Sequence, residues 1–349
     1  MTKDKIETIL EDGRIVMAQA PVIISASRST DIPAFYADWF FHRLQIGYSA
    51  WTNPFNGVKS YINYRQTRFI IFWSKDPTPL LPYLKILREK NIGCYVQYTL
   101  NDYEKENLEK RVPALERRID TFKRLVDELG LGGVIWRFDP LLLTDTVGIN
   151  ELLAKIEYIG NKLHGYTEKL VFSYADITEY RKVKANLDRQ QIHYRIWDEK
   201  EKNQMASALS ILNKKWNYQL ATCAENIALE HYDIMHNRCI DTDLIVRRAY
   251  NDATLMKFLQ VNICTQGLFD ATLPTGAIAL PNGHYFFSRH KKDGGQRTFC
   301  QCAIAKDIGE YNTCPHQCEY CYANTNKDIA WSNYEQHLRK PFCETISGK

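Results

Sequence analysis

Six cysteines lie within the last fifty positions of the chain and form its densest group of chemically capable residues. Three of them, Cys314, Cys318 and Cys321, follow the pattern C-x-x-x-C-x-x-C. Thiolates are the ligands of iron–sulfur clusters, and three of them on one short loop can close over a single cluster. A [4Fe-4S] cluster held by three protein thiolates keeps one iron open to a further ligand. The spacing therefore predicts a cluster with a reactive position.

A zinc site is the alternative for the same three cysteines. A fourth ligand such as His316, Cys300 or Cys302 would complete a closed tetrahedral shell. Structural zinc sites usually carry two paired C-x-x-C knuckles, and the spacing here differs from that pattern. The spacing therefore favours iron–sulfur and leaves zinc open.

Four further thiols provide a second hypothesis. Cys223 and Cys239 lie in the middle of the chain, and Cys300 and Cys302 form C-x-C ahead of the triad. Four thiolates suffice for an auxiliary iron–sulfur cluster or a structural zinc that attaches the irregular tail to the rest of the protein. The alternative is that Cys223 and Cys239 are buried small apolar side chains.

Short apolar, β-rich runs alternate with amphipathic helical patterns from residue 21 to about residue 222. The helical pattern at 113–130 keeps one apolar face and stops at Gly130. Such alternation predicts an α/β protein with a complete or partial (β/α) TIM-like barrel, followed by a C-terminal cysteine-rich segment that binds a cluster. No eighth strand is predicted. The seven predicted strand runs are 22–33, 48–55, 69–77, 92–103, 133–140, 169–176 and 218–226.

The chain divides into three predicted parts. Residues 1–20 form an N-terminal extension, residues 21–299 form the barrel with a helical insertion around 227–299, and residues 300–349 form the iron–sulfur segment. With 45% apolar residues the chain can fill a sizeable core, which excludes disorder as its main state.

Polar side chains that follow barrel strands converge at one mouth, where chemistry takes place. We expect one set of them to hold cofactor or substrate, because a guanidinium grips carboxylate or phosphate as a fork. For Asp31 and Asp139 the alternative is a helix N-cap. The predicted catalytic residues are Arg28, Asp31, Lys75, Arg137 and Asp139, and the predicted cofactor-binding residues are Gln97, Thr99, Asn101, Ser173 and Tyr320.

The triad, with the aromatic Tyr320 before its last cysteine, resembles the signature of the radical S-adenosylmethionine enzymes. In that superfamily the open iron is chelated by S-adenosylmethionine. One electron from the cluster then cleaves this ligand to a 5′-deoxyadenosyl radical that abstracts a substrate hydrogen. The resemblance implies a [4Fe-4S] cluster, S-adenosylmethionine and an electron donor such as a flavodoxin or ferredoxin, with Tyr320 near the cluster and the adenine.

A closer resemblance covers most of the chain. The pieces SRSTDIPAFY, FWSKDP, VIWRFDP and KDIGEYNTCPHQCEYCYAN resemble an uncharacterised bacterial domain-of-unknown-function family, whose C-terminal cysteine cluster is similar to that of the radical enzymes. Here the signature follows the last predicted strand instead of the first. No Gly-Gly-Glu motif follows it, so residues at the mouth are expected to bind S-adenosylmethionine.

Net charge and hydropathy limit the classes of partner that the sequence indicates. The chain has 45 Lys and Arg residues and 41 Asp and Glu residues, so its net charge is +4. This charge is too small to indicate a nucleic-acid partner by itself. The basic turn at 289–297 could contact a polynucleotide, although a solvated turn explains it as well. No run of about 18 apolar residues and no secretory leader occur, so we expect a cytoplasmic protein without a membrane partner.

Two other classes of function remain open. One is an iron–sulfur protein of nucleic-acid processing or electron transfer without radical chemistry, in which the cluster is structural. The other is a zinc-stabilised barrel. No residue pattern identifies the substrate.

Overall fold

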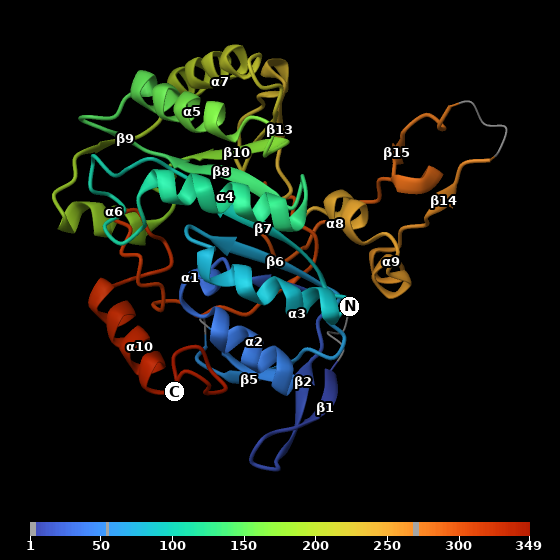
Figure 1. The fold of residues 1–349 in the computed structure, drawn as a ribbon. Coiled ribbons are helices and arrows are strands. Elements are labelled where there is room, and N and C mark those ends of the chain that lie inside the picture. The colour runs from blue at the N-terminus through green and yellow to red at the C-terminus, as the bar shows by residue number, and fades with distance from the viewer. Residues whose placement is uncertain (1–4, 54–55, 268–271) are drawn as a thin grey trace.

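The structure is a computed structural model that describes residues 5–53, 56–267 and 272–349 (Figure 1). A sheet of parallel strands lies at its centre, in the order β13-β12-β10-β8-β7-β6-β3-β17. Its inner strands are buried on both faces, as expected for a parallel sheet with both faces covered. The bounds are β3 (Ile23–Ala26), β6 (Phe69–Ser74), β7 (Gly93–Thr99), β8 (Val134–Leu141), β10 (Lys169–Tyr174), β12 (Gln219–Thr222), β13 (Ile234–His236) and β17 (Lys306–Asp307).

Six of the seven predicted strand runs belong to this sheet. The run at 48–55 does not: β4 (Tyr48–Thr52) pairs antiparallel with β5 (Lys59–Asn63) in a second sheet. Residues 54–55 of that run lie outside the described residues. The remaining strands of the second sheet are β1 (Lys5–Ile9) and β2 (Ile15–Gln19). The short connection to β5 offers β4 a nearby antiparallel partner, which the periodicity of a single run does not reveal.

The central sheet is open within the described ranges. Its edge strands β13 and β17 each pair with one neighbour, and no closed barrel is found. The predicted α/β class with a parallel sheet is confirmed, and the closed form of the barrel is not. The two edge strands are three and two residues long, too short for a sequence pattern to show them.

Alternate residues of the strands face two hydrophobic cores. Ile70 and Phe72 of β6 pack in one core and Ile71 in the other, as the period of two requires. The second core is covered by α8 (Thr242–Ala249), α9 (Ala253–Leu259) and the chain around Cys239 and Cys302. The first is covered by α1 (Ile32–Phe35), α2 (Ala37–Ile46), α3 (Leu84–Glu89), α4 (Leu115–Leu129), α5 (Ile149–Leu163), α6 (Arg181–Arg189) and α7 (Glu199–Asn213).

Helix α4 confirms the pattern predicted at 113–130. Its apolar face is buried, and Gly130 ends it with a φ of 77°, a value that glycine adopts at little cost. Within the helical insertion predicted around 227–299, α8 and α9 are separate helices, because Asp252 caps the second one: its carboxylate accepts from the backbone N–H of Leu255.

The remaining elements lie around this body. A small sheet of β14, β16 and β15 projects from it, drawn in orange in Figure 1, and the C-terminal helix α10 (Lys327–Arg339) packs against the first core through Tyr334. No helix in the described part of the chain is long and apolar enough to cross a membrane. The bounds are β9 (Leu143–Thr144), β11 (Tyr194–Arg195), β14 (Cys264–Thr265), β15 (Ala277–Ala279), β16 (His284–Phe287), and the 3-10 helices η1 (Thr78–Tyr83), η2 (Glu230–Tyr232) and η3 (Pro281–Gly283).

A buried histidine on α10 gives the fold a predicted acid sensitivity. His337 is 1% exposed, its ring lies against Tyr36, and burial lowers its pKa below 6.5. As pH falls below about 6.5, the unfolded chain takes up this proton first, so stability decreases. We expect His337→Phe to lose less stability than the native protein between pH 7 and pH 5 in urea unfolding. The exposed control, His164→Phe, should keep the native pH dependence; equal slopes for all three proteins would contradict the assignment.

Candidate functional site

The loop that carries the cysteine triad is attached to the segment that follows β7. We call residues 312–326 the cysteine loop. Cys318 forms an isolated antiparallel bridge with Glu109, and the backbone N–H of Glu319 donates to the carbonyl of Leu108 at 2.9 Å. On the other side Asn186 of α6 donates its side-chain amide to the carbonyl of Cys321 at 3.1 Å. These contacts to the backbone of Cys318, Glu319 and Cys321 hold the second half of the triad in place.

The three thiols of the triad face a shared, largely buried environment. Cys314, Cys318 and Cys321 lie within electrostatic reach of one another, and Cys318 is 7% exposed. Burial raises the pKa of all three thiols, whereas the Lys75 ammonium acts in the opposite direction on Cys318 and Cys321. A buried cation beside the loop favours the thiolate form that metal binding requires.

His316 lies inside the triad, and both of its ring nitrogens have partners. Its Nε2 is 2.8 Å from Oδ2 of Asp31, and its Nδ1 is 3.2 Å from the carbonyl oxygen of Arg111. Asp31 also accepts from the backbone N–H groups of Ala34 and Lys75, at 3.0 and 2.7 Å. The N-cap interpretation of Asp31 is thus confirmed, and the same carboxylate holds the imidazole away from a ligand role.

A buried ionic network holds Tyr320. The Lys75 ammonium lies 2.6 Å from a Glu109 carboxylate oxygen and donates to the Tyr320 hydroxyl at 2.9 Å. Tyr320 itself donates to Glu109, and the Asn101 amide donates to Tyr320 at 3.0 Å. Burial would raise the pKa of Glu109, but Lys75 and Arg118 outweigh it and bring the pKa to about 2. Four predicted site residues, Asp31, Lys75, Asn101 and Tyr320, therefore lie together at the cysteine loop.

The other four thiols also come together, on the opposite face of the sheet. The sulfurs of Cys223 and Cys239 are 3.4 Å apart. The Cys302 thiol is hydrogen-bonded to the thiols of both Cys239 and Cys300. We call Cys223, Cys239, Cys302 and Cys300, in that order, the thiol row.

Predicted mouth residues surround the thiol row. Arg137 donates to the sulfur of Cys239 at 3.1 Å and to the Gln97 side-chain oxygen at 3.2 Å. Its other nitrogen pairs with Asp139, which accepts from the Ser173 hydroxyl. Asp139 lies within β8, so its N-cap interpretation is wrong. A side chain inside a strand has no free helical N–H groups to cap.

Thr99 and Arg28 complete the predicted set. Thr99 ends β7 and is paired with Arg137 in the ladder to β8. The Arg28 guanidinium lies 5.3 Å from the centre of the Trp73 ring, and its Nη2 is buried without a hydrogen-bond partner. The carbonyl of Arg28 accepts from the hydroxyl of Tyr322, the residue after the triad, at 2.6 Å. Arg28 thus contacts the cysteine loop through its carbonyl. Its guanidinium lies near the thiol row, because Cys302, Cys239 and Cys300 all raise its pKa.

The pKa is lowered for two thiols of the row, Cys239 and Cys300, which favours their thiolate forms. Hydrogen bonds from Cys223 and Cys302, with help from Arg137, bring the pKa of Cys239 well below the ordinary value. The hydrogen bond from Cys302 also lowers the pKa of Cys300, to about 6. Sulfur anions are therefore stabilised by donors that the chain itself supplies.

Three residues of this region were not among the predicted site residues. Glu109 lies in an irregular charged stretch that carries no signal of a buried ion pair. Trp73 looks like an ordinary strand residue, yet its ring lies against the Arg28 and Arg137 guanidiniums. Asp307 ends β17 and accepts from the hydroxyls of Ser25 and Ser27 at 2.8 and 2.7 Å, so recognition of an eighth strand would have pointed to it.

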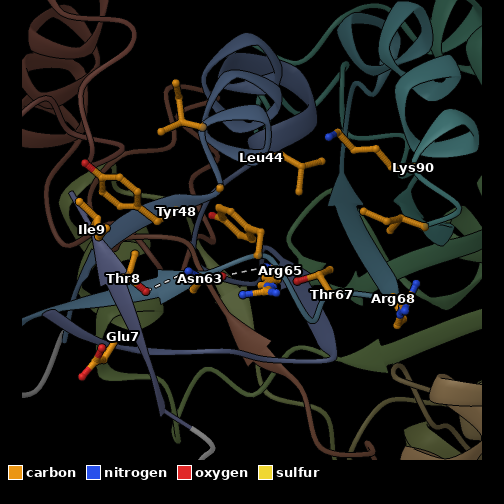
Figure 2. Close-up of a pocket in the computed structure, with 14 residues that line it drawn as sticks. Glu7, Thr8, Ile9, Leu44, Tyr48, Asn63, Arg65, Thr67, Arg68 and Lys90 are labelled. Carbon is orange, nitrogen blue, oxygen red and sulfur yellow. Dashed lines mark hydrogen bonds between the residues drawn. The ribbon is translucent and has the colours of Figure 1, made fainter. Parts of the chain in front are cut away.

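A separate groove has no cysteine in its lining. It is bounded by β1, β5 and α2, has a volume of about 600 Å³, and contains none of the predicted site residues (Figure 2). Its polar contacts are structural: Asn63 donates to Thr8 at 2.9 Å and accepts from the backbone of Arg65 at 2.9 Å. We therefore assign it no role in the chemistry.

The fold and the two cysteine sets define an α/β protein with an open parallel sheet, a thiol-bearing segment on each side of it and the buried Arg137 beside one of them. Residues 23–323 match the family described as Domain of unknown function (DUF1848), and the chain belongs to that family. The family resemblance stated from the sequence is thereby confirmed, while its cysteine-cluster chemistry stays a prediction. No curated protein and no solved structure matches the chain.

Proposed function

We propose that this protein is an iron–sulfur enzyme of the radical S-adenosylmethionine type, with a [4Fe-4S] cluster on Cys314, Cys318 and Cys321. One observation carries the proposal: the triad stands alone on a fixed loop, and the candidates for a fourth ligand are engaged elsewhere. His316 is held by Asp31 and Arg111, and Cys302 belongs to the thiol row. Three thiolates without a fourth suit a cluster with an open iron better than a closed zinc shell.

The triad as it stands is not arranged around a single metal ion. Within the described ranges, no three His, Cys, Asp or Glu side chains are placed to hold a single metal ion as they stand. Thiolates on a cluster bind different irons and stand farther apart than the ligands of one ion. The triad thiols, near enough to act on each other electrostatically, are compatible with that wider arrangement.

The chain's own residues then have distinct roles. Lys75, Glu109 and Tyr320 position the cysteine loop, and the Lys75 ammonium stabilises its thiolates. Arg28 has a buried nitrogen without a partner and would bind a carboxylate of cofactor or substrate. Arg137 is already engaged with Asp139, Gln97 and the thiol row, so it positions these groups instead.

The bound cofactors would supply the difficult chemistry: one electron from the cluster and, with S-adenosylmethionine, a carbon radical that abstracts a substrate hydrogen. The chain's part is to orient the substrate at the strand ends and to exclude water. In this proposal the open sheet is a partial barrel, and the electron comes from a flavodoxin or a ferredoxin. The substrate is not assigned, because fold alone does not define one.

Anaerobic purification with iron and sulfide analysis tests the proposal, followed by electron paramagnetic resonance of the reduced protein. We expect S-adenosylmethionine to change the cluster signal and 5′-deoxyadenosine to accumulate. If S-adenosylmethionine does not change the cluster signal and no nucleoside forms, the radical chemistry is rejected and the protein is an iron–sulfur protein of another kind. A colourless protein whose triad binds zinc would overturn the cluster itself.

A further inference from the structure

Two sulfurs of the thiol row are as close to each other as two ligands of one small ion. A tetrahedral shell with zinc–sulfur distances of about 2.3 Å has sulfur–sulfur edges of about 3.8 Å. The sulfurs of Cys223 and Cys239 are 3.4 Å apart, and the Cys302 thiol is in hydrogen-bond contact with those of Cys239 and Cys300. Thiols on a [4Fe-4S] cluster would have to be spread more widely, since each binds a different iron.

The surroundings of the row match an anionic centre. Zinc with four thiolates carries a net charge of −2, and two guanidiniums face this set: Arg137 donates to the Cys239 sulfur, and Arg28 lies within electrostatic reach of three of the thiols. The Asn237 amide donates to the same sulfur at 3.0 Å. Donors of this kind around a metal-bound thiolate orient it and tune its charge.

The row joins the two open edges of the central sheet. Cys223 follows β12 and Cys239 follows β13 at one edge, whereas Cys300 and Cys302 precede β17 at the other. The backbone N–H of Ala303 donates to the carbonyl of Ile240 at 2.9 Å, so the two segments already touch. An ion held by both segments would connect edges that no ladder hydrogen bond connects in the described chain.

We infer that Cys223, Cys239, Cys300 and Cys302 bind one zinc ion that fastens the two edges of the sheet together. The four thiols form a row and do not yet surround a common point. Cys300 and Cys302 lie on irregular chain, so they can turn toward Cys239 without breaking a ladder. Binding converts the thiols to thiolates and releases their protons to solvent. The inference is independent of the proposed radical chemistry.

The test uses the full chain with the triad replaced by alanine, so that the proposed cluster cannot contribute. We expect this protein to purify with one zinc ion per chain and no acid-labile sulfide. Cobalt in place of zinc should give the thiolate-to-metal charge-transfer absorption of a tetrahedral sulfur site. Adding Cys239→Ala should abolish zinc binding, whereas Cys264→Ala, a cysteine of β14 outside the row, should leave it intact.

A conservative variant separates lost ligation from lost folding. Cys300→His keeps a zinc ligand, so it should retain the metal and shift the cobalt spectrum toward that of a Cys₃His site. Retention of full zinc in the Cys239→Ala protein would overturn the inference. Iron and sulfide bound by the row, or a metal-free protein with four freely titratable thiols in the row, would overturn it as well.

Discussion

Replacing Cys318 by alanine should abolish binding of the iron and acid-labile sulfide that we propose for the triad, while the chain stays folded. Cys318 is the middle thiol of the triad, and a cluster with only two protein thiolates loses the chelation that retains it. The cysteine loop keeps its other attachments, because the bonds from Glu319 to Leu108 and from Asn186 to Cys321 do not involve the thiol. Iron and sulfide analysis of anaerobically purified protein, with circular dichroism for the fold, provides the measurement.

The matched control is Cys264→Ala, which removes a half-buried thiol from β14 without touching either cysteine set. It should retain the native amount of iron. If Cys318→Ala also kept its iron and sulfide, the triad could not be the ligand set, and the proposed function would fail. The zinc site inferred for the thiol row would survive that result, because it uses none of the triad residues.

Lys75→Met should destabilise the fold by about 3–5 kcal/mol, the usual cost of removing one partner from a buried ion pair. The Lys75 ammonium is 2.6 Å from Glu109, whose side chain is 1% exposed. Without Lys75, Glu109 would keep the hydrogen bond from Tyr320 and the Arg118 guanidinium at 3.8 Å. The hydroxyl of Tyr320 would lose the same donor, so the cysteine loop should loosen. Urea unfolding measures the stability, and iron content after reconstitution measures the loop.

An exposed lysine supplies the control for this experiment. Lys85 pairs with Glu89 on the surface of α3 at 3.7 Å, with its side chain 77% exposed, so Lys85→Met should cost no more than about 0.5 kcal/mol. Equal effects of the two substitutions would show that Lys75 is not a buried partner of Glu109. A loss of stability at Lys75 with unchanged iron content would remove its role in positioning the triad.

Local pattern was enough to locate several features. The triad can be recognised from its spacing alone, and helix α4 can be recognised from its apolar face and from Gly130 at its end. Gln97 and Arg137 were predicted as site residues from their positions near the carboxyl ends of two strand runs. Each of these depends on residues a few positions apart, so the order of amino acids contains the relevant information.

The grouping of the thiols depended on contacts across the whole chain. C-x-C at Cys300 and Cys302 was a candidate source of the fourth triad ligand, yet the folded chain places Cys302 beside Cys239. His316 was another candidate, and Asp31 occupies its ring. No spacing rule predicts such pairings, because the partners belong to strands whose neighbours are chosen by the packing of the sheet.

The amino-acid order alone determined the class of fold, the short-range elements and the presence of a thiol-rich tail. Tertiary structure decided that the sheet stays open, that Lys75 and Tyr320 meet over Glu109, and that seven cysteines separate into a triad and a row. The physical reason is range: periodicity and capping act within a few residues, whereas buried charges and thiols find partners only when distant segments share one desolvated interior.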